Sequence, residues 1–196
     1  TAITHSSNIW ESKYLNHIIN LKKNLYNLNK YGVHERKNER NLVYSSIAIA
    51  TFYNSVFNIP LGRKDDLDVP RIIKQTADTN IIAAFLRGLV DTDFGLVLKN
   101  KYGIIYPALV GSSKSRKLIA SLSGLFKKLN IKHNLSLNEK GFDSRTKKYY
   151  IIHKIIFNGY DRVRKVFSII KPKNEKYYRR IGETIQRLEA IINLKK

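Results

Sequence analysis

Two stretches of this chain follow the same order of secondary-structure signals, and this internal repeat limits the possible folds more than any other feature. Each stretch has an amphipathic helix pattern, two strand-like runs and a second helix, which is followed by proline and basic residues. The first strand of the first stretch is only weakly marked. The helices and strands are expected at 11–27, within 31–39, at 41–45 and 47–57, and then at 112–129, 131–137, 149–157 and 160–170. The pattern predicts a divergent duplication, with chance agreement of short patterns as the alternative.

A short acidic segment separates the two stretches. Residues 65–69 precede a proline, which gives two predicted domains, 1–69 and 70–196. Residues 71–78 are expected to form a linker into the next helix. The pattern of 173–194 is that of an amphipathic helix, and we expect this helix to pack against the second stretch.

The chain is strongly basic. It carries 36 Lys and Arg residues against 15 Asp and Glu, a formal net charge of +21. Such an excess is repulsive in a compact fold and is typical of proteins with a polyanionic partner. Nucleic acid is the first candidate, because each neutralised phosphate releases counterions, and a membrane surface is the second. A soluble basic protein without such a partner is the third reading.

Other classes of protein are excluded by composition. Cysteine is absent, which excludes disulfides and a cysteine-type zinc site, and the five histidines have no metal-ligand spacing. No apolar run approaches the roughly 20 residues of a membrane span, and no signal peptide is present at the start. We therefore expect no membrane partner and an intracellular, soluble protein of the cytoplasm or an organelle.

The residues best suited to chemistry lie between the two stretches. A helix is expected from residue 80, with Asp78 or Thr79 as its cap, and Asp91 and Asp93 lie at its end. The helix dipole disfavours anions at a C-terminus, so these carboxylates favour a nearby cation. Mg²⁺ fits, because hard divalent cations bind carboxylate oxygens.

Two small residues mark one face of the same helix. Ala84 and Gly88 are four residues apart and therefore lie on one side, where the backbone of another helix can approach closely. A glycine inside a helix costs about 1 kcal/mol relative to alanine, which close packing of a second helix would offset. We expect a helix–helix contact at this face.

A basic hairpin follows the two acids. Strands are expected at 94–99 and 102–110, with the turn at Asn100 and Lys101. Exposed basic strands beside metal-binding carboxylates are typical of a sheet that lies along a nucleic-acid groove.

The segment before this hairpin reads Leu86-Arg87-Gly88-Leu89-Val90-Asp91-Thr92-Asp93, followed by Phe94 and Gly95. Further on stand Pro107 in the second strand, the serines at 112–115 and Lys171-Pro172 near the end. These features resemble the LAGLIDADG homing endonucleases and their signature motif, although the phenylalanine delays the final glycine. The resemblance implies an α+β fold of αββαββα units, each with a saddle-shaped antiparallel sheet, and it extends over nearly the whole chain.

The resemblance also implies roles for individual residues. Asp93 would bind the metal, Mg²⁺, with Asp91 as the helix-end residue that supports it. Lys171 would line the active site, with Lys173 as an alternate. Arg63 or Lys64 would be the counterpart in the first stretch, and Ser112 would orient water. Ala84 and Gly88 would form the helix-pairing interface. The residues expected to contact double-stranded DNA are Lys99, Lys101, Arg116, Lys132, Arg145, Lys147 and Lys148.

One departure from the family pattern bears on function. The first stretch is a truncated second copy, because only a short segment precedes it, and residues 1–4 would be the stub of a strand. The missing motif helix would come from a second copy in a homodimer or from a separate partner chain, or the chain has lost activity. The implied function is a site-specific double-strand DNA endonuclease. The alternative is a catalytically inactive or maturase-like DNA- or RNA-binding protein of the same fold.

Overall fold

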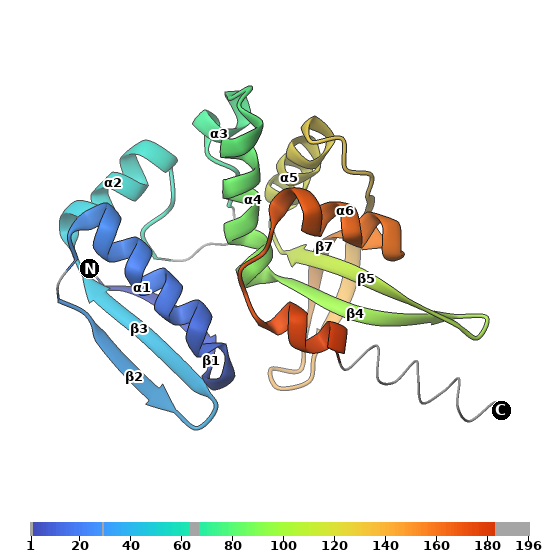
Figure 1. Cartoon of the computed structure of the whole chain (residues 1–196), viewed down its shortest axis with the longest axis horizontal. Helices are drawn as coiled ribbons and strands as arrows, with labels where there is room; N and C mark the ends of the chain where they lie inside the picture. Colours follow the sequence, from blue (N-terminus) through green and yellow to red (C-terminus); the bar gives the residue numbers. More distant parts are fainter. Residues whose placement is uncertain (1, 29, 63–66, 183–196) are drawn as a thin grey trace. The chain divides into compact units, whose positions relative to one another are not determined.

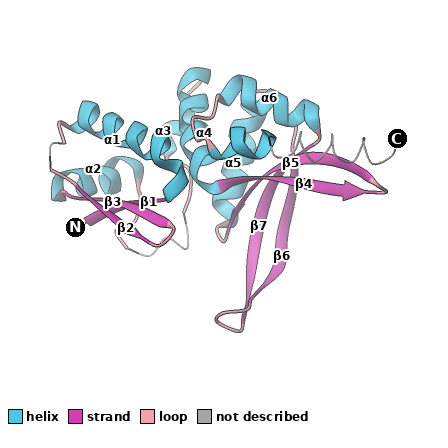
Figure 2. Ribbon diagram, turned by 60° about the horizontal axis from the view of Figure 1, so that its bottom comes forward, coloured by secondary structure: helices cyan, strands magenta, loops and turns pink. Residues whose placement is uncertain are grey.

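The computed structural model describes residues 2–28, 30–62 and 67–182 (Figure 1). The chain forms two compact units: unit 1 comprises Thr1–Val56 and Lys173–Lys196, and unit 2 comprises Phe57–Pro172. Each unit combines helices with an antiparallel sheet (Figure 2), so the predicted α+β class is confirmed. Within the described ranges, every helix is too short or too polar to cross a membrane.

Unit 2 contains the complete αββαββα succession, preceded by one short helix within the segment predicted as a linker. The strands form one antiparallel sheet in the order β4-β5-β7-β6, so the two hairpins meet through β5 and β7. Helices cover one face of this sheet (Figure 2). The elements are α3 (Arg71–Gln75), α4 (Thr79–Asp93), β4 (Phe94–Lys101), β5 (Ile104–Ser113), α5 (Arg116–Lys128), β6 (Asn134–Asp143), β7 (Lys148–Asn158) and α6 (Tyr160–Ile170).

Phe94 joins the end of α4 to the sheet. It is the first residue of β4, lies opposite Gly111 of β5, and packs its ring near the rings of Phe126 and Phe157. A Cβ atom at position 111 would lie 2.4 Å from the Phe94 ring, so the ring fits only above a glycine. The end of α4 is therefore held against the aromatic core of unit 2.

Unit 1 repeats most of this succession. Its three strands are ordered β1-β3-β2, as β5-β7-β6 are in unit 2, and α1 and α2 take the places of α5 and α6 in chain order. The expected strand at the start of the chain is present and pairs with β3. The predicted internal repeat is therefore visible in the fold. The elements are β1 (Ala2–Asn8), the 3-10 turn η1 (Ile9–Glu11), α1 (Ser12–Tyr26), β2 (Gly32–Arg36), β3 (Glu39–Ser45) and α2 (Ile47–Phe57).

The turn between β4 and β5 lies two residues later than predicted. Tyr102 and Gly103 form it, with φ angles of 53° and 79°, and the Gly103 amide donates a 3.0 Å hydrogen bond to the Asn100 side chain. Two consecutive residues at positive φ match the twist of a hairpin, and glycine adopts this conformation without strain. Asn100 and Lys101 therefore belong to the strand.

The described part of the C-terminal segment, residues 173–182, packs within unit 1. Asn174 donates a 2.8 Å hydrogen bond to Glu11, and the Arg179 guanidinium lies 3.7 Å from the centre of the Trp10 ring. This differs from the expected packing against the second stretch, because an amphipathic pattern identifies an apolar face but not its polar and cation–π partners. Residues 183–194 of the predicted helix lie outside the described residues.

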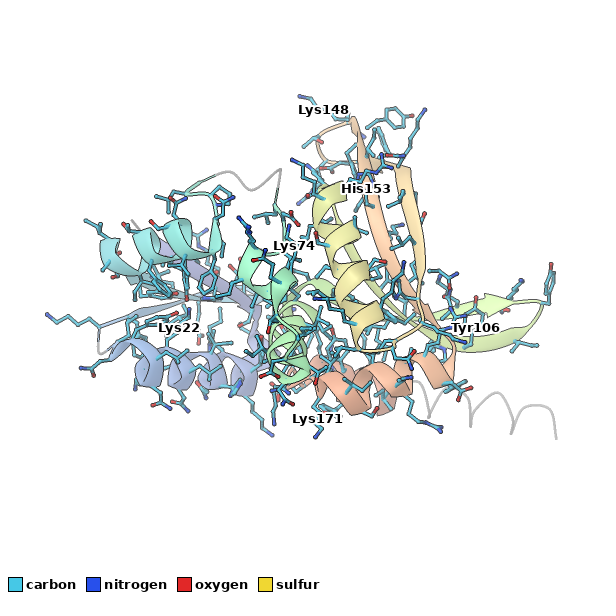
Figure 3. The ribbon with its side chains drawn as sticks, turned by 90° about the horizontal axis from the view of Figure 1, so that it is seen from above. Lys22, Lys74, Tyr106, Lys148, His153 and Lys171 are labelled. Carbon is cyan, nitrogen blue, oxygen red and sulfur yellow. The ribbon has the colours of Figure 1, made fainter. Side chains whose placement is uncertain are left out.

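The half-buried Lys22, labelled in Figure 3, lies close to three tyrosine rings of unit 1. The Lys22 ammonium lies 5.0–5.4 Å from the ring centres of Tyr26, Tyr44 and Tyr53, and it donates a hydrogen bond to the Tyr53 hydroxyl. Tyr44 is the next-to-last residue of β3, as Phe157 is of β7. Unit 1 therefore adds a polar, aromatic cluster beside its apolar core of Leu15 and Leu42, whereas Phe157 of unit 2 packs among other phenylalanines.

Burial shifts the titration of this cluster in two directions. It lowers the pKa of Lys22 to about 8 and raises the pKa of Tyr44 to about 12, and it also raises the pKa of Tyr53. A lysine with a lowered pKa in the folded state adds stability as pH rises from the folded to the unfolded pKa. A tyrosine whose pKa is raised in the folded state loses its contribution to stability as pH rises above its pKa in the unfolded state, near 10.

We expect the free energy of unfolding of the protein to rise by about 1 kcal/mol between pH 8 and 10, with Lys22 as the source, and to fall above about pH 10. Lys22→Met should abolish the rise, and Lys23→Met, at the exposed neighbouring lysine, should keep it. Urea denaturation followed by circular dichroism at each pH measures this. If the free energy of unfolding changed with pH in the same way for wild type and Lys22→Met, Lys22 would not be the source of the rise.

Candidate active site and nucleic-acid interface

Helix α4 carries the two motif acids in its last turn. Asp78 caps its start by accepting hydrogen bonds from the backbone of Asn80 at 2.7 Å and Ile81 at 3.4 Å. At the other end the chain passes into β4 without a loop, because the C-cap residue Phe94 is already extended. Asp93 therefore stands one residue before the first strand of the sheet.

The two acids have different surroundings. Asp91 is 2% exposed and interacts with other groups of the chain, whereas Asp93 is exposed. Asp93 has no hydrogen bond or ion pair within the described residues. The predicted division of roles, with Asp93 as ligand and Asp91 as support, requires this exposure at Asp93.

The donor set of this site suits a cation that keeps much of its own water. Within the part of the chain that the structure describes, no three His, Cys, Asp or Glu residues gather in a way that could hold a metal. Mg²⁺ commonly binds through one or two carboxylates, with waters and substrate phosphates as its other ligands. The exposed carboxylate of Asp93 fits such a site, and a closed all-protein cage does not.

Lys171 is held next to α4 through the end of α6. It is the C-cap of α6, with φ 51°, and its amide donates a 3.0 Å hydrogen bond to the Phe167 carbonyl. The preceding residue, Ile170, accepts a 2.7 Å hydrogen bond from the Arg87 side chain of α4. The exposed Lys171 side chain therefore begins where α6 ends beside α4 (Figure 3).

Basic residues follow the face of the sheet that the helices do not cover. In β7, His153, Ile155 and Phe157 are buried under the helices, so the alternate residues of this strand point to the other face, the open face. Lys99 of β4 reaches this face, because its ammonium donates a 3.2 Å hydrogen bond to Asn158.

The register places further residues on the open face. Tyr106 lies opposite Lys99, and Lys101, two residues along β4, points the same way. In β7, Lys148 and Lys154 alternate with the buried residues, and Ser112 of β5 pairs with Lys154. Tyr106 and Lys148 are labelled in Figure 3.

The seven predicted DNA contacts therefore divide into groups. Lys99, Lys101 and Lys148 share the open face, and Arg145 and Lys147 lie at the turn between β6 and β7. Arg116 and Lys132 do not join them, because Arg116 begins α5 on the covered side and Lys132 precedes β6.

Comparison with known proteins finds likeness only in structure, since no family model and no curated protein matches. The LAGLIDADG homing endonuclease I-GzeII, in complex with a DNA target, superposes with a TM-score of 0.57 and 13% identity, over 99% of this chain and 81% of its own. Variants of the homing endonuclease I-DmoI give 0.55 and 13%, over 86% and 74%. A double mutant of I-SmaMI gives 0.54 and 11%, over 96% and 81%.

This chain has the LAGLIDADG homing-endonuclease fold. The expected αββαββα unit and its incomplete repeat are the two units described above. Arg63 and Lys64, the suggested counterparts of Lys171, lie outside the described residues, and its suggested alternate, Lys173, is exposed in unit 1.

Within the LAGLIDADG fold, two residues of this chain are placed where the sequence did not predict a role. Lys154 lies on the open face and forms an ion pair with Glu139, and this hydrogen bond lowers the pKa of Glu139. Because side chains along a strand alternate between its two faces, the even spacing within residues 148–154 was the signal that could have placed Lys154 on the same face as Lys148. Arg87 occupies an apolar position of the motif, and this unusual cation was the signal for its bond to α6.

We expect the two motif acids to differ in their effect on stability. Asp91→Ala should lower the free energy of unfolding by about 1–3 kcal/mol, because it removes a buried group that interacts within the fold. Asp93→Ala should change it by less than about 0.5 kcal/mol, since an exposed anion at a helix C-terminus adds no stability. Urea denaturation measures both, and equal losses would contradict the assigned difference.

Proposed function

We propose that this protein is a site-specific DNA endonuclease of the homing-endonuclease type, which hydrolyses phosphodiesters with a divalent metal, Mg²⁺. The observation that carries the proposal is the position of Asp93. Its carboxylate is exposed at the junction between α4 and β4, the strand from which Lys99 and Lys101 project onto the open face. A carboxylate beside a basic sheet is an arrangement for metal-assisted attack on a nucleic-acid backbone.

Double-stranded DNA is the proposed partner of the open face. Its cations can neutralise phosphates, and the net charge of +21 favours association with a polyanion. The structural neighbours support this partner, since I-DmoI is described in complexes with target DNA and with Ca, Mn or Mg. An antiparallel β-ribbon fits the major groove, where base edges can be distinguished.

The proposed chemistry assigns a separate task to each residue of the site. Asp93 supplies anionic oxygens for a divalent cation, and buried Asp91 supports the helix end that carries it. Lys171 supplies an exposed positive charge for the phosphate on which negative charge develops. Ser112, on the open face, can orient a water molecule. When bound, the metal would lower the pKa of the attacking water and stabilise the leaving oxygen.

A second motif helix is part of the proposal. Ala84 and Gly88 are exposed on α4, and a Cβ atom at position 88 would have no neighbour within 4 Å. Small residues at this spacing allow the backbone of another helix to come close. A homodimer, or a partner chain with its own motif helix, would bring a second carboxylate to the site.

A DNA- or RNA-binding protein without cleavage is the second candidate, as in a maturase-like role. One observation favours it: within the described residues the only exposed motif carboxylate is that of Asp93. Both candidates require the basic open face, and only the first requires the carboxylate, so a change at Asp93 separates them.

We expect Asp93→Asn to abolish Mg²⁺-dependent cleavage of a plasmid library that contains the target, while affinity for DNA stays equal or rises. The substitution removes a metal ligand and one negative charge near the phosphates. Asp161→Asn, at an exposed acid of α6, is the matched control and should cut normally. Equal cutting by wild type and Asp93→Asn would refute the metal role, and tight binding without any cutting by wild type would select the second candidate.

We expect Gly88→Leu to reduce the fraction of paired chains by about tenfold or more, because a leucine side chain separates closely packed helices. Gly124→Leu is the matched control, since Gly124 is exposed in the middle of α5 and a Cβ atom there also has no neighbour within 4 Å. Sedimentation with and without duplex DNA measures the mass. A mass that Gly88→Leu leaves unchanged in both conditions would contradict pairing at this face.

A further inference from the structure

A basic pocket lies in unit 2 at the edge strand β6, away from the motif acids. It has a volume of about 360 Å³, within the range of about 300–1,000 Å³ that is usual for ligand sites. The end of α5, the segment before β6 and the start of α6 form its walls. The residues that line it are Lys127, Asn130, Ile131, Lys132, His133 and Arg162.

The backbone of one wall is fixed by the end of α5. Asn130 is in the left-handed conformation, with φ 54°, and its amide donates a 2.8 Å hydrogen bond to the Lys127 carbonyl. The Ile131 amide donates a 2.9 Å bond to the Phe126 carbonyl. This pair of bonds is the Schellman arrangement, which closes a helix and sets the direction of the chain that follows. Lys127 and Lys132 are therefore attached to a defined turn.

His133 belongs to the framework of the pocket. One ring nitrogen, Nδ1, lies 2.9 Å from the Ile131 carbonyl and must donate to it, since a carbonyl only accepts. The other, Nε2, lies 2.8 Å from the Ser123 hydroxyl. The ring also packs against Phe126 and Phe157 of the core. Both nitrogens are thus engaged, and the imidazole fixes the base of the pocket.

Arg162 is oriented by a side chain of the edge strand. Its Nη1 donates a 2.5 Å hydrogen bond to the Asn134 side chain, which leaves the other donors of the guanidinium for a ligand. Arg162 is in the first turn of α6, so its cation faces the pocket from a second element. A guanidinium matches the geometry of a phosphate group better than a lysine does.

The charge of the pocket has one sign. Lys127, Lys132 and Arg162 line it, and among the residues that the structure describes no Asp or Glu does. Three cations around one cavity repel each other, and a bound anion removes that repulsion. The turn, the imidazole and the Asn134 bond hold the walls before any ligand arrives, which reduces the entropy lost on binding.

We propose that this pocket binds a phosphate group of a nucleic-acid backbone, at a site separate from the open face of the sheet. The volume leaves room for the sugars beside the phosphate. The inference that the phosphate belongs to nucleic acid depends on the proposed DNA binding, whereas the phosphate site itself does not. Of the predicted DNA contacts, Lys132 is thereby assigned to this pocket.

The first test uses inorganic phosphate as the probe. In a titration followed by amide NMR at constant ionic strength, wild-type protein should show saturable shifts at residues 130–133. Lys127→Gln/Lys132→Gln should weaken the apparent affinity by about tenfold or more. Arg164→Gln/Lys165→Gln, which removes two exposed cations of α6 outside the pocket, should match wild type. Shifts spread evenly over all basic segments, or equal weakening in both variants, would overturn the phosphate site.

The second test identifies the source of the phosphate. Binding of duplex DNA, measured by fluorescence anisotropy over a range of salt, should lose about two units of salt slope in the pocket variant. Its affinity should therefore fall below wild type most at low salt and approach wild type at high salt. Phosphate binding with an unchanged salt slope would refute the nucleic-acid source and retain the site. Absence of all DNA binding in wild type would refute the proposed function. The phosphate titration would still test whether the pocket binds phosphate.

Discussion

The contact between Phe94 and Gly111 fixes the end of α4 and with it the position of Asp93, the proposed metal ligand. The ring of Phe94 enters the aromatic core, and the missing side chain at Gly111 makes room for it. Because Asp93 directly precedes Phe94, the position of the carboxylate follows from this packing and not from a flexible loop. The phenylalanine that interrupts the motif before Gly95 thus has a structural reason: it anchors the helix end where a small residue would not.

The sequence predicted those parts of the fold that depend on local signals. Helices α2 and α6 have the expected bounds, since apolar periodicity and a following proline mark both, and the cap at Asp78 was visible as a residue type. The strand β2 was hidden in a polar run, because it is an edge strand with mostly exposed residues and so lacks the apolar alternation of a half-buried strand. The hairpin turn was misplaced since the decisive residue was Gly103, which forms the turn through its positive φ.

The candidate site could be predicted only in part, because only some of its residues lie in a local sequence motif. Asp91 and Asp93 stand in a local motif, but their different burial depends on what packs against α4. Lys154 and Lys99 came to share one face only through the strand order, with β5 and β7 paired in the middle of the sheet. The pocket at Lys132 also required the third dimension, because its cations come from α5, α6 and the segment between α5 and β6. Sequence periodicity describes one helix or strand at a time and cannot predict which elements lie side by side in the fold.

The ion pair of Glu139 with Lys154 gives the open face a property that uniform positive charge would lack. A phosphate that approaches Lys154 must compete with a carboxylate that is already in place, and the carboxylate itself repels the backbone. A duplex that offers Glu139 a hydrogen-bond donor, such as the amino group of a cytosine, avoids this penalty, whereas other duplexes do not. In the proposed nucleic-acid interface, an acid among the cations would therefore lower affinity for DNA in general and raise discrimination between sequences.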